Sequence, residues 1–155
     1  LRFLWRRQRR QFENCSGSEI SAILRSLVRV EYKLRNKRKL GFNTWDGVPC
    51  CSIPNSMVDC IIDAMDHLKF ICNDPVVCSD IDTDCAWDLV SGWIQVIYVC
   101  FGNFSGEMRL QECLVHELSH ACGTDDTDRD KSDKRYWFNA YKYQPCVRRL
   151  PWEPL

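Results

Sequence analysis

Apolar residues recur at helical spacing in three segments of the chain. They line one face of residues 19 to 34, whose other face carries arginines, and form a single stripe in residues 56 to 70. The third segment, 107 to 121, has the same spacing and is followed by Gly123, a residue typical of a helix end. Because residues three and four positions apart share one face of a helix, these patterns predict three amphipathic helices.

Two other segments predict a strand and a loop. Residues 93 to 101, WIQVIYVCF, are rich in β-branched and aromatic side chains, whereas residues 73 to 88 mix Asp, Cys, Pro and Ser without periodicity. We therefore expect an α+β fold in which the 93–101 strand forms the edge of a small sheet over the helix of residues 107 to 121. The chain has no repeats and no low-complexity linker, so we expect one domain, residues 1 to 155, with a basic N-terminal arm at residues 1 to 14.

The charges are unevenly distributed, although the formal net charge is zero. Residues 1 to 40 carry twelve Lys or Arg and three Glu, a balance of +9 that leaves the remaining residues at −9. This asymmetry predicts that the basic region packs against, or is solvated beside, an acidic body. An arm that binds nucleic acid or anionic lipid is the alternative, because five arginines cluster around Trp5. No nucleic-acid fold signature accompanies them, so we expect no nucleic-acid partner.

The chain has eleven cysteines, at positions 15, 50, 51, 60, 72, 78, 85, 100, 113, 122 and 146. Such a content predicts disulfides formed in an oxidising compartment, and hence a protein that is secreted or delivered outside the producing cell. The odd number leaves at least one thiol unpaired. A cysteine-rich zinc module is disfavoured because no CxxC spacing occurs. Cys60, Cys100 and Cys113 lie in apolar segments, where small buried thiols are an equally good interpretation. No apolar stretch approaches the roughly 20 residues of a membrane span.

The predicted helix at 107–121 contains His116, Glu117 and His120 in an HExxH pattern. Histidines four positions apart lie one turn from each other on one helix face, so both can reach one metal ion at about 2.0–2.1 Å. Glu117, next to the first histidine, is placed to take a proton from a metal-activated water. The spacing therefore predicts a zinc site, with Glu117 as general base.

A catalytic zinc site needs a third protein ligand and one open position. Gly123 allows the chain to leave the helix through a left-handed turn and return towards the metal, and Asp126 follows His120 by six residues. We expect Asp126 to be the third ligand, with Asp125 and Asp128 as rivals. Cys122 is either a thiolate ligand or part of a disulfide that fixes this turn, and we favour the disulfide.

The pattern HExxHxxGxxD resembles the extended motif of the metzincin clan in its aspartate form, as in the small snapalysin-type proteases. Residues 123 to 126 also look like the GT-containing aspartate motif of aspzincins such as deuterolysin. Both resemblances imply a zincin-like fold and a zinc peptidase with Asp126 as ligand. The chain departs from both families: no methionine follows Asp126 to form a methionine turn, and the nearest later tyrosine is Tyr136. The strand, the motif helix and the many cysteines are also similar to metallopeptidase toxin domains of bacterial secreted effectors.

These observations predict a zinc-dependent endopeptidase that hydrolyses a polypeptide substrate. A tyrosine in the segment after the motif, Tyr136, Tyr141 or Tyr143, is a candidate to stabilise the oxyanion, with structural aromatic packing as an equal alternative. If the 93–101 strand forms the edge above the cleft, it would bind the extended peptide. If the protein is a toxin, a dedicated inhibitor or immunity protein is an expected partner. The alternative from another class is a non-catalytic, zinc-stabilised domain that binds through its basic arm.

Overall fold

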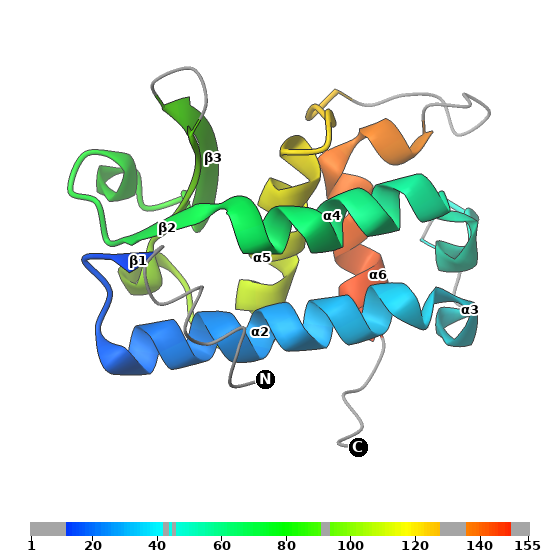
Figure 1. Cartoon of the computed structure of the whole chain (residues 1–155), viewed down its shortest axis with the longest axis horizontal. Helices are drawn as coiled ribbons and strands as arrows, with labels where there is room; N and C mark the ends of the chain where they lie inside the picture. The colour runs from blue at the N-terminus through cyan, green and yellow to red at the C-terminus, as the bar shows by residue number, and fades with distance from the viewer. Residues whose placement is uncertain (1–11, 42–43, 45, 91–93, 128–135, 150–155) are drawn as a thin grey trace.

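The computed structural model describes residues 12–41, 44, 46–90, 94–127 and 136–149. Helices and a small mixed sheet pack together, as expected for an α+β fold (Figure 1). The sheet lies at one end of the molecule, and two long helices run side by side across the view.

The three predicted helices form, and each begins and ends within three residues of its predicted limits. The first starts with a capping box: the Ser16 hydroxyl accepts the Glu19 backbone N–H, and the Glu19 carboxylate accepts the Ser16 N–H. Two shorter helices complete the described α structure. The helices are α2 (Gly17–Arg35), α3 (Lys37–Leu40), α4 (Asn55–His67), α5 (Glu107–His120) and α6 (Gln144–Arg149).

The described residues form a sheet of four strands in the order β1-β2-β4-β3. Strand β4 pairs in parallel with β2 and antiparallel with β3, and the short β1 pairs in parallel with β2. The strands are β1 (Phe12–Glu13), β2 (Lys69–Cys72), β3 (Cys85–Val90) and β4 (Ile94–Val99).

The predicted strand at 93–101 forms as β4, but its expected edge position is wrong. Strand β4 lies between β2 and β3, and the edge beside α5 is β3. The apolar sequence of β4 reflects a strand with neighbours on both sides, whereas β3 ends in three exposed residues and has a weaker pattern. The predicted loop at 73–88 is therefore also wrong in its last four residues, which belong to β3.

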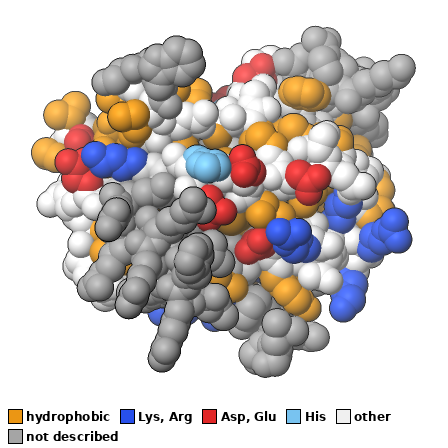
Figure 2. All heavy atoms as spheres, viewed as in Figure 1, with side chains coloured by type: hydrophobic (Ala, Val, Ile, Leu, Met, Phe, Trp, Pro, Cys, Tyr) orange, Lys and Arg blue, Asp and Glu red, His pale blue; other side chains and the backbone are white. Residues whose placement is uncertain are grey.

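The predicted N-terminal arm is only partly described. Residues 1 to 11 lie outside the described residues, and Phe12 and Glu13 form β1, so the end of the arm belongs to the sheet. Phe12 stacks on Phe70 with 5.4 Å between ring centroids. On the face seen in Figure 2, acidic side chains lie near the centre and several Lys and Arg side chains lie on one side. The short helix α3 contributes three basic residues.

Ten of the eleven cysteines form disulfides, so the cysteines do not form a zinc module. Cys60, Cys100 and Cys113 are among them, which corrects their interpretation as buried thiols, because an apolar setting suits a disulfide equally well. The Cys60–Cys122 disulfide confirms the expected role of Cys122. The remaining cysteine, Cys51, is free and exposed. The pairs are Cys15–Cys72, Cys50–Cys146, Cys60–Cys122, Cys78–Cys100 and Cys85–Cys113.

Helix α5 lies at the centre of the molecule. Helices α2, α4 and α6 and strand β3 all pack against it, and every residue from Leu110 to Ser119 is buried. Because burial on all sides removes water from polar side chains, each polar group on α5 needs a partner or a function. None of the helices in the described part of the chain is both long and apolar enough to cross a membrane.

Candidate metal centre

The chain reverses direction directly after His120. Gly123 has a φ of 94°, a conformation that favours glycine, and the Thr124 N–H donates to the Ser119 carbonyl at 3.3 Å. The Cys60–Cys122 disulfide ties the turn to α4. The turn returns Asp126 to the face of α5 that carries His116 and His120, as the sequence predicted.

Three ligand atoms from these residues form a small triangle. The Nε2 atoms of His116 and His120 lie 3.2 Å apart, and Oδ1 of Asp126 lies 3.0 Å from the first and 3.1 Å from the second. Tetrahedral zinc with bonds of about 2.0–2.1 Å separates its ligand atoms by about 3.3 Å. Two imidazoles and one carboxylate are also a donor set typical of catalytic zinc. The described residues therefore fit a zinc ion.

Few protons are available to the three ligand atoms of the triangle. Nδ1 of His120 lies 3.0 Å from the Thr124 carbonyl, which can only accept, so the proton of a neutral His120 is on Nδ1 and its Nε2 is bare. Burial, and next the adjacent His120 ring, lower the pKa of His116 and keep that ring neutral at pH 7. With both rings neutral, one proton at most, on Nε2 of His116, is shared among three acceptor atoms, whereas a single cation satisfies all three.

Glu117 lies beside the triangle with 9% of its surface exposed. Burial raises the pKa of its carboxyl to about 8, and the hydrogen bond donated by the Trp87 backbone N–H opposes this rise. The side chain is not sealed in the core, because it lines the same pocket as the histidines. A cation bound at the triangle would favour the ionised form of this carboxyl, and the resulting carboxylate would be suited to accept a proton there.

A pocket of about 620 Å³ opens over the triangle. Residues Asp82 to Trp87, which include the start of the edge strand β3, line one wall. Tyr141 and Gln144 line it as well, and the Asp126 side chain is 56% exposed. The site therefore has room for a water molecule and a larger ligand.

The structure separates the three candidate tyrosines. Tyr141, in the 3₁₀ turn Ala140–Tyr143, lies edge-on to the His116 ring, 4.5 Å between centroids, and is half-exposed in the pocket. Tyr136 is buried away from the pocket lining and hydrogen-bonds with Thr44 and Asp46. Tyr143 is fully buried and donates its hydroxyl to the Trp137 carbonyl. Of the three, Tyr141 alone lines the site.

The two rival ligands are placed differently. Asp125 lines the pocket, but its carboxylate accepts the Thr127 N–H and its backbone bridges to Asn139, and it is not part of the triangle. Asp128 lies outside the described residues. Among the residues that the structure describes, Asp126 is the carboxylate that meets both histidines.

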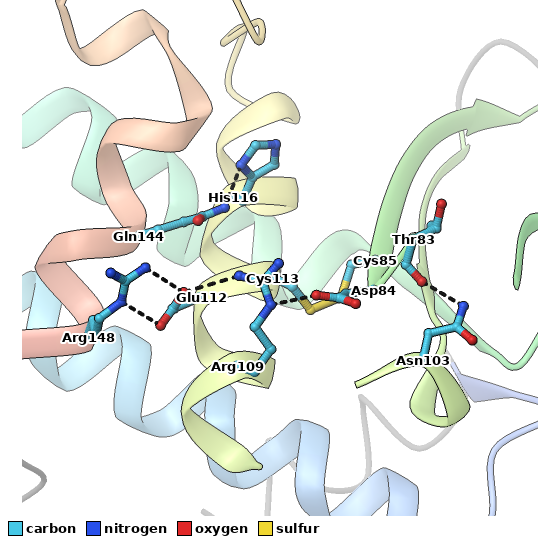
Figure 3. A network of polar contacts seen from close by, with 10 residues as sticks. All are labelled: Thr83, Asp84, Cys85, Asn103, Arg109, Glu112, Cys113, His116, Gln144 and Arg148. Carbon is cyan, nitrogen blue, oxygen red and sulfur yellow. Dashed lines mark hydrogen bonds and ion pairs between the residues drawn. A yellow bond between two sulfur atoms is a disulfide. The ribbon is translucent and has the colours of Figure 1, made fainter. Parts of the chain in front are cut away.

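Sequence reasoning missed two residues of this site. Trp87 holds Glu117 through its backbone N–H, so its side-chain type carried no signal. Gln144 donates from Nε2 towards Nδ1 of His116 at 3.0 Å and lies 28 positions after it (Figure 3). A lone glutamine so far away has no pattern that would have marked it.

No family model matches the chain. No curated protein and no solved structure matches it either.

Proposed function

We propose that the protein is a zinc-dependent endopeptidase. The observation that carries the proposal is the triangle of His116, His120 and Asp126 beside a buried glutamate in an open pocket. A structural zinc site is usually closed by four protein ligands, whereas the described residues supply three here and face a cavity. This arrangement favours catalysis over the alternative of a non-catalytic domain stabilised by zinc.

Each residue has a distinct part in the proposed reaction. When bound, zinc would supply Lewis acidity that polarises a water molecule and the scissile carbonyl. Glu117 accepts the proton of that water and delivers it to the leaving amine. The Tyr141 hydroxyl is the candidate donor to the oxyanion that develops on the carbonyl, because its ring borders both the pocket and His116.

The open edge of β3 favours an extended peptide as substrate. The Cys100 N–H donates to the Asp84 carbonyl, and hydrogen-bonded pairs alternate along an antiparallel ladder. Residues 84, 86 and 88 therefore bond to β4, whereas residues 85, 87 and 89 direct their backbone groups to the open side. The Trp87 N–H, which donates to Glu117, follows this alternation. Because Glu117 already occupies the Trp87 N–H, a peptide added to this edge would pair with the remaining outward backbone groups and lie in the pocket beside the metal triangle.

The disulfides support a place of action outside the cytosol of the producing cell. Five disulfides join the described elements, and such bonds persist mainly in oxidising compartments. A secreted peptidase, including a toxin restrained by an inhibitor protein, is consistent with this chemistry.

The decisive experiment compares the parent protein with Glu117→Gln. Zinc content is measured by elemental analysis, and proteolysis by the cleavage of denatured protein substrates. We expect about one zinc ion per chain in both proteins. Cleavage by the variant should fall by at least about a hundredfold, because general-base catalysis contributes about 10² to 10⁴.

Glu107→Gln is the matched control. Glu107 begins the same helix, pairs with Arg25 and Arg29 far from the triangle, and should be replaceable without loss of cleavage. Equal cleavage by the parent and Glu117→Gln would exclude the proposed chemistry. Zinc binding without cleavage in the parent would favour the non-catalytic domain.

A further inference from the structure

Helices α5 and α6 are joined by two polar contacts that lie one helical turn apart. Gln144 contacts His116, and four residues later Arg148 donates to both carboxylate oxygens of Glu112 at 2.8 and 3.0 Å (Figure 3). Since 144 pairs with 116 and 148 with 112, the two helices run in opposite directions at this contact. Gln144 is thus held in register with the first histidine of the metal triangle.

Several interactions fix this register. Arg109 donates to Glu112 as well, at 3.2 Å, so the carboxylate joins two arginines. Glu112 is 5% exposed, and a buried carboxylate with two such partners resists displacement. The Cys50–Cys146 disulfide anchors α6 two residues after Gln144. The glutamine side chain is therefore presented to His116 by a firmly docked helix.

Metal binding requires one particular tautomer of His116. Its Nε2 atom faces the triangle, so a bound ion requires the ring proton to be on Nδ1, where a partner must accept it. His120 already favours the corresponding tautomer, because its Nδ1 faces the Thr124 carbonyl, which can accept the proton. The partner of His116 is an amide, which can donate through its nitrogen or accept through its oxygen.

We propose that Gln144 is the positioning residue that sets the tautomer of His116 for metal binding. This inference rests on the proposed zinc site. Without metal, the amide nitrogen donates to Nδ1, and the proton on Nε2 of His116 bonds to Asp126. With metal, the amide turns about its last carbon–carbon bond, its oxygen accepts the Nδ1 proton, and Nε2 is free to bind the ion.

The test compares three variants of the full chain. Gln144→Met keeps the side-chain length but removes both polar functions, and Gln144→Glu keeps only the acceptor. Arg148→Met is the control for helix docking, because it removes the second contact of α6 without touching the histidine. Zinc affinity is measured by competition with a chromophoric chelator, and the tautomer of His116 by ¹⁵N NMR of its ring in zinc-free and zinc-loaded protein.

Gln144→Met should bind zinc about ten- to a hundredfold more weakly, as is usual when a ligand loses its hydrogen-bond partner. Gln144→Glu should restore the affinity to within about threefold of the parent or tighten it. In the parent the ring proton should move from Nε2 to Nδ1 when zinc binds, whereas in Gln144→Glu it should already be on Nδ1 without zinc. Arg148→Met should lower stability but leave the zinc affinity of the folded protein unchanged.

The possible failures are distinguishable. If the parent binds zinc and Gln144→Met binds it equally tightly, or if the zinc-free tautomer is the same in the parent and Gln144→Glu, the role of Gln144 is wrong while the zinc site stands. If Arg148→Met weakens zinc binding as much as Gln144→Met, helix docking explains the effect and the inference is overturned. A parent that binds no zinc contradicts the proposed function itself.

Discussion

The two halves of helix α5 both bury polar groups but surround them with different partners. In the first half, Glu112 is neutralised by two arginines, and Gln111 accepts a hydrogen bond from the buried ammonium of Lys33 at 2.6 Å. In the second half, His116 and His120 meet Asp126, and with both rings neutral the three acceptor atoms share one proton at most. Both halves contain buried polar side chains, so burial alone does not separate structural from functional polar groups. The feature that separates them is the lack, among the described residues, of a positive charge beside the acceptor atoms of the second half.

The largest effect is expected from Asp126→Asn, which tests directly whether the three acceptor atoms bind a cation. Loss of the carboxylate should lower zinc affinity by more than about a hundredfold, because outer-shell partners alone are worth about ten- to a hundredfold. Proteolysis should fall with it. Asp125→Asn, one residue away, is the matched control and should bind zinc normally, as measured by chelator competition. The reverse result would make Asp125 the ligand.

The next largest effect is expected from the loss of the Cys60–Cys122 disulfide, which holds the turn after helix α5. Replacing Cys60 and Cys122 together by alanine opens a loop with a sequence separation of 62 residues. In the chain-entropy treatment this should cost about 4 kcal/mol of unfolding free energy. Zinc affinity should fall as well, because the turn that carries Asp126 loosens. Chemical denaturation gives the first quantity and chelator competition the second. Unchanged zinc affinity would show that the turn holds its shape without the disulfide.

A smaller effect is expected from a substitution in the first half of helix α5. Glu112→Gln removes the charge that joins Arg109 and Arg148 and should lower the free energy of unfolding by about 1–3 kcal/mol. Both arginine side chains are about half-exposed, so water limits the loss. Denaturant titration measures the change. Zinc affinity should stay within about threefold of the parent value, since outer-shell losses begin at about tenfold. A larger change would show that the two halves are coupled through this cluster.

The smallest effect is a pH dependence at Lys33. Burial, reinforced by the charge of Arg29, lowers the pKa of its ammonium from 10.5 to about 8 in the folded protein. Between these values the unfolded chain binds the proton and the folded chain does not, so stability should rise as pH increases from about 8 to 10.5. The gain should be on the order of 1 kcal/mol. Denaturation at several pH values should show this rise in the parent but not in Lys33→Met.

Features encoded by local sequence could be predicted, and those that depend on distant contacts could not. The motif helix, its glycine turn and the approach of Asp126 follow from spacing within eleven residues. The neighbours of β4 depend on the whole sheet, so its apolar sequence was wrongly interpreted as an edge strand. The cysteine pairs were equally open, because many pairings suit the same positions.

The same distinction applies to the site. His116, Glu117, His120 and Asp126 come from one continuous segment and were found together. Gln144 comes from another helix, and its place opposite His116 depends on the docking of α6 against α5. A single sequence gives no measure of such packing.

The disulfide framework implies an order of assembly. Cys85–Cys113 joins β3 to the helix one turn before the first histidine, and Cys60–Cys122 joins α4 to the turn after the second. The three candidate ligands are therefore held in place by cross-links formed during oxidative folding, and in the proposed zinc site the ion would be a late addition to a finished scaffold. Unlike a zinc finger, which unfolds without its metal, this protein should survive chelation folded and regain zinc without refolding.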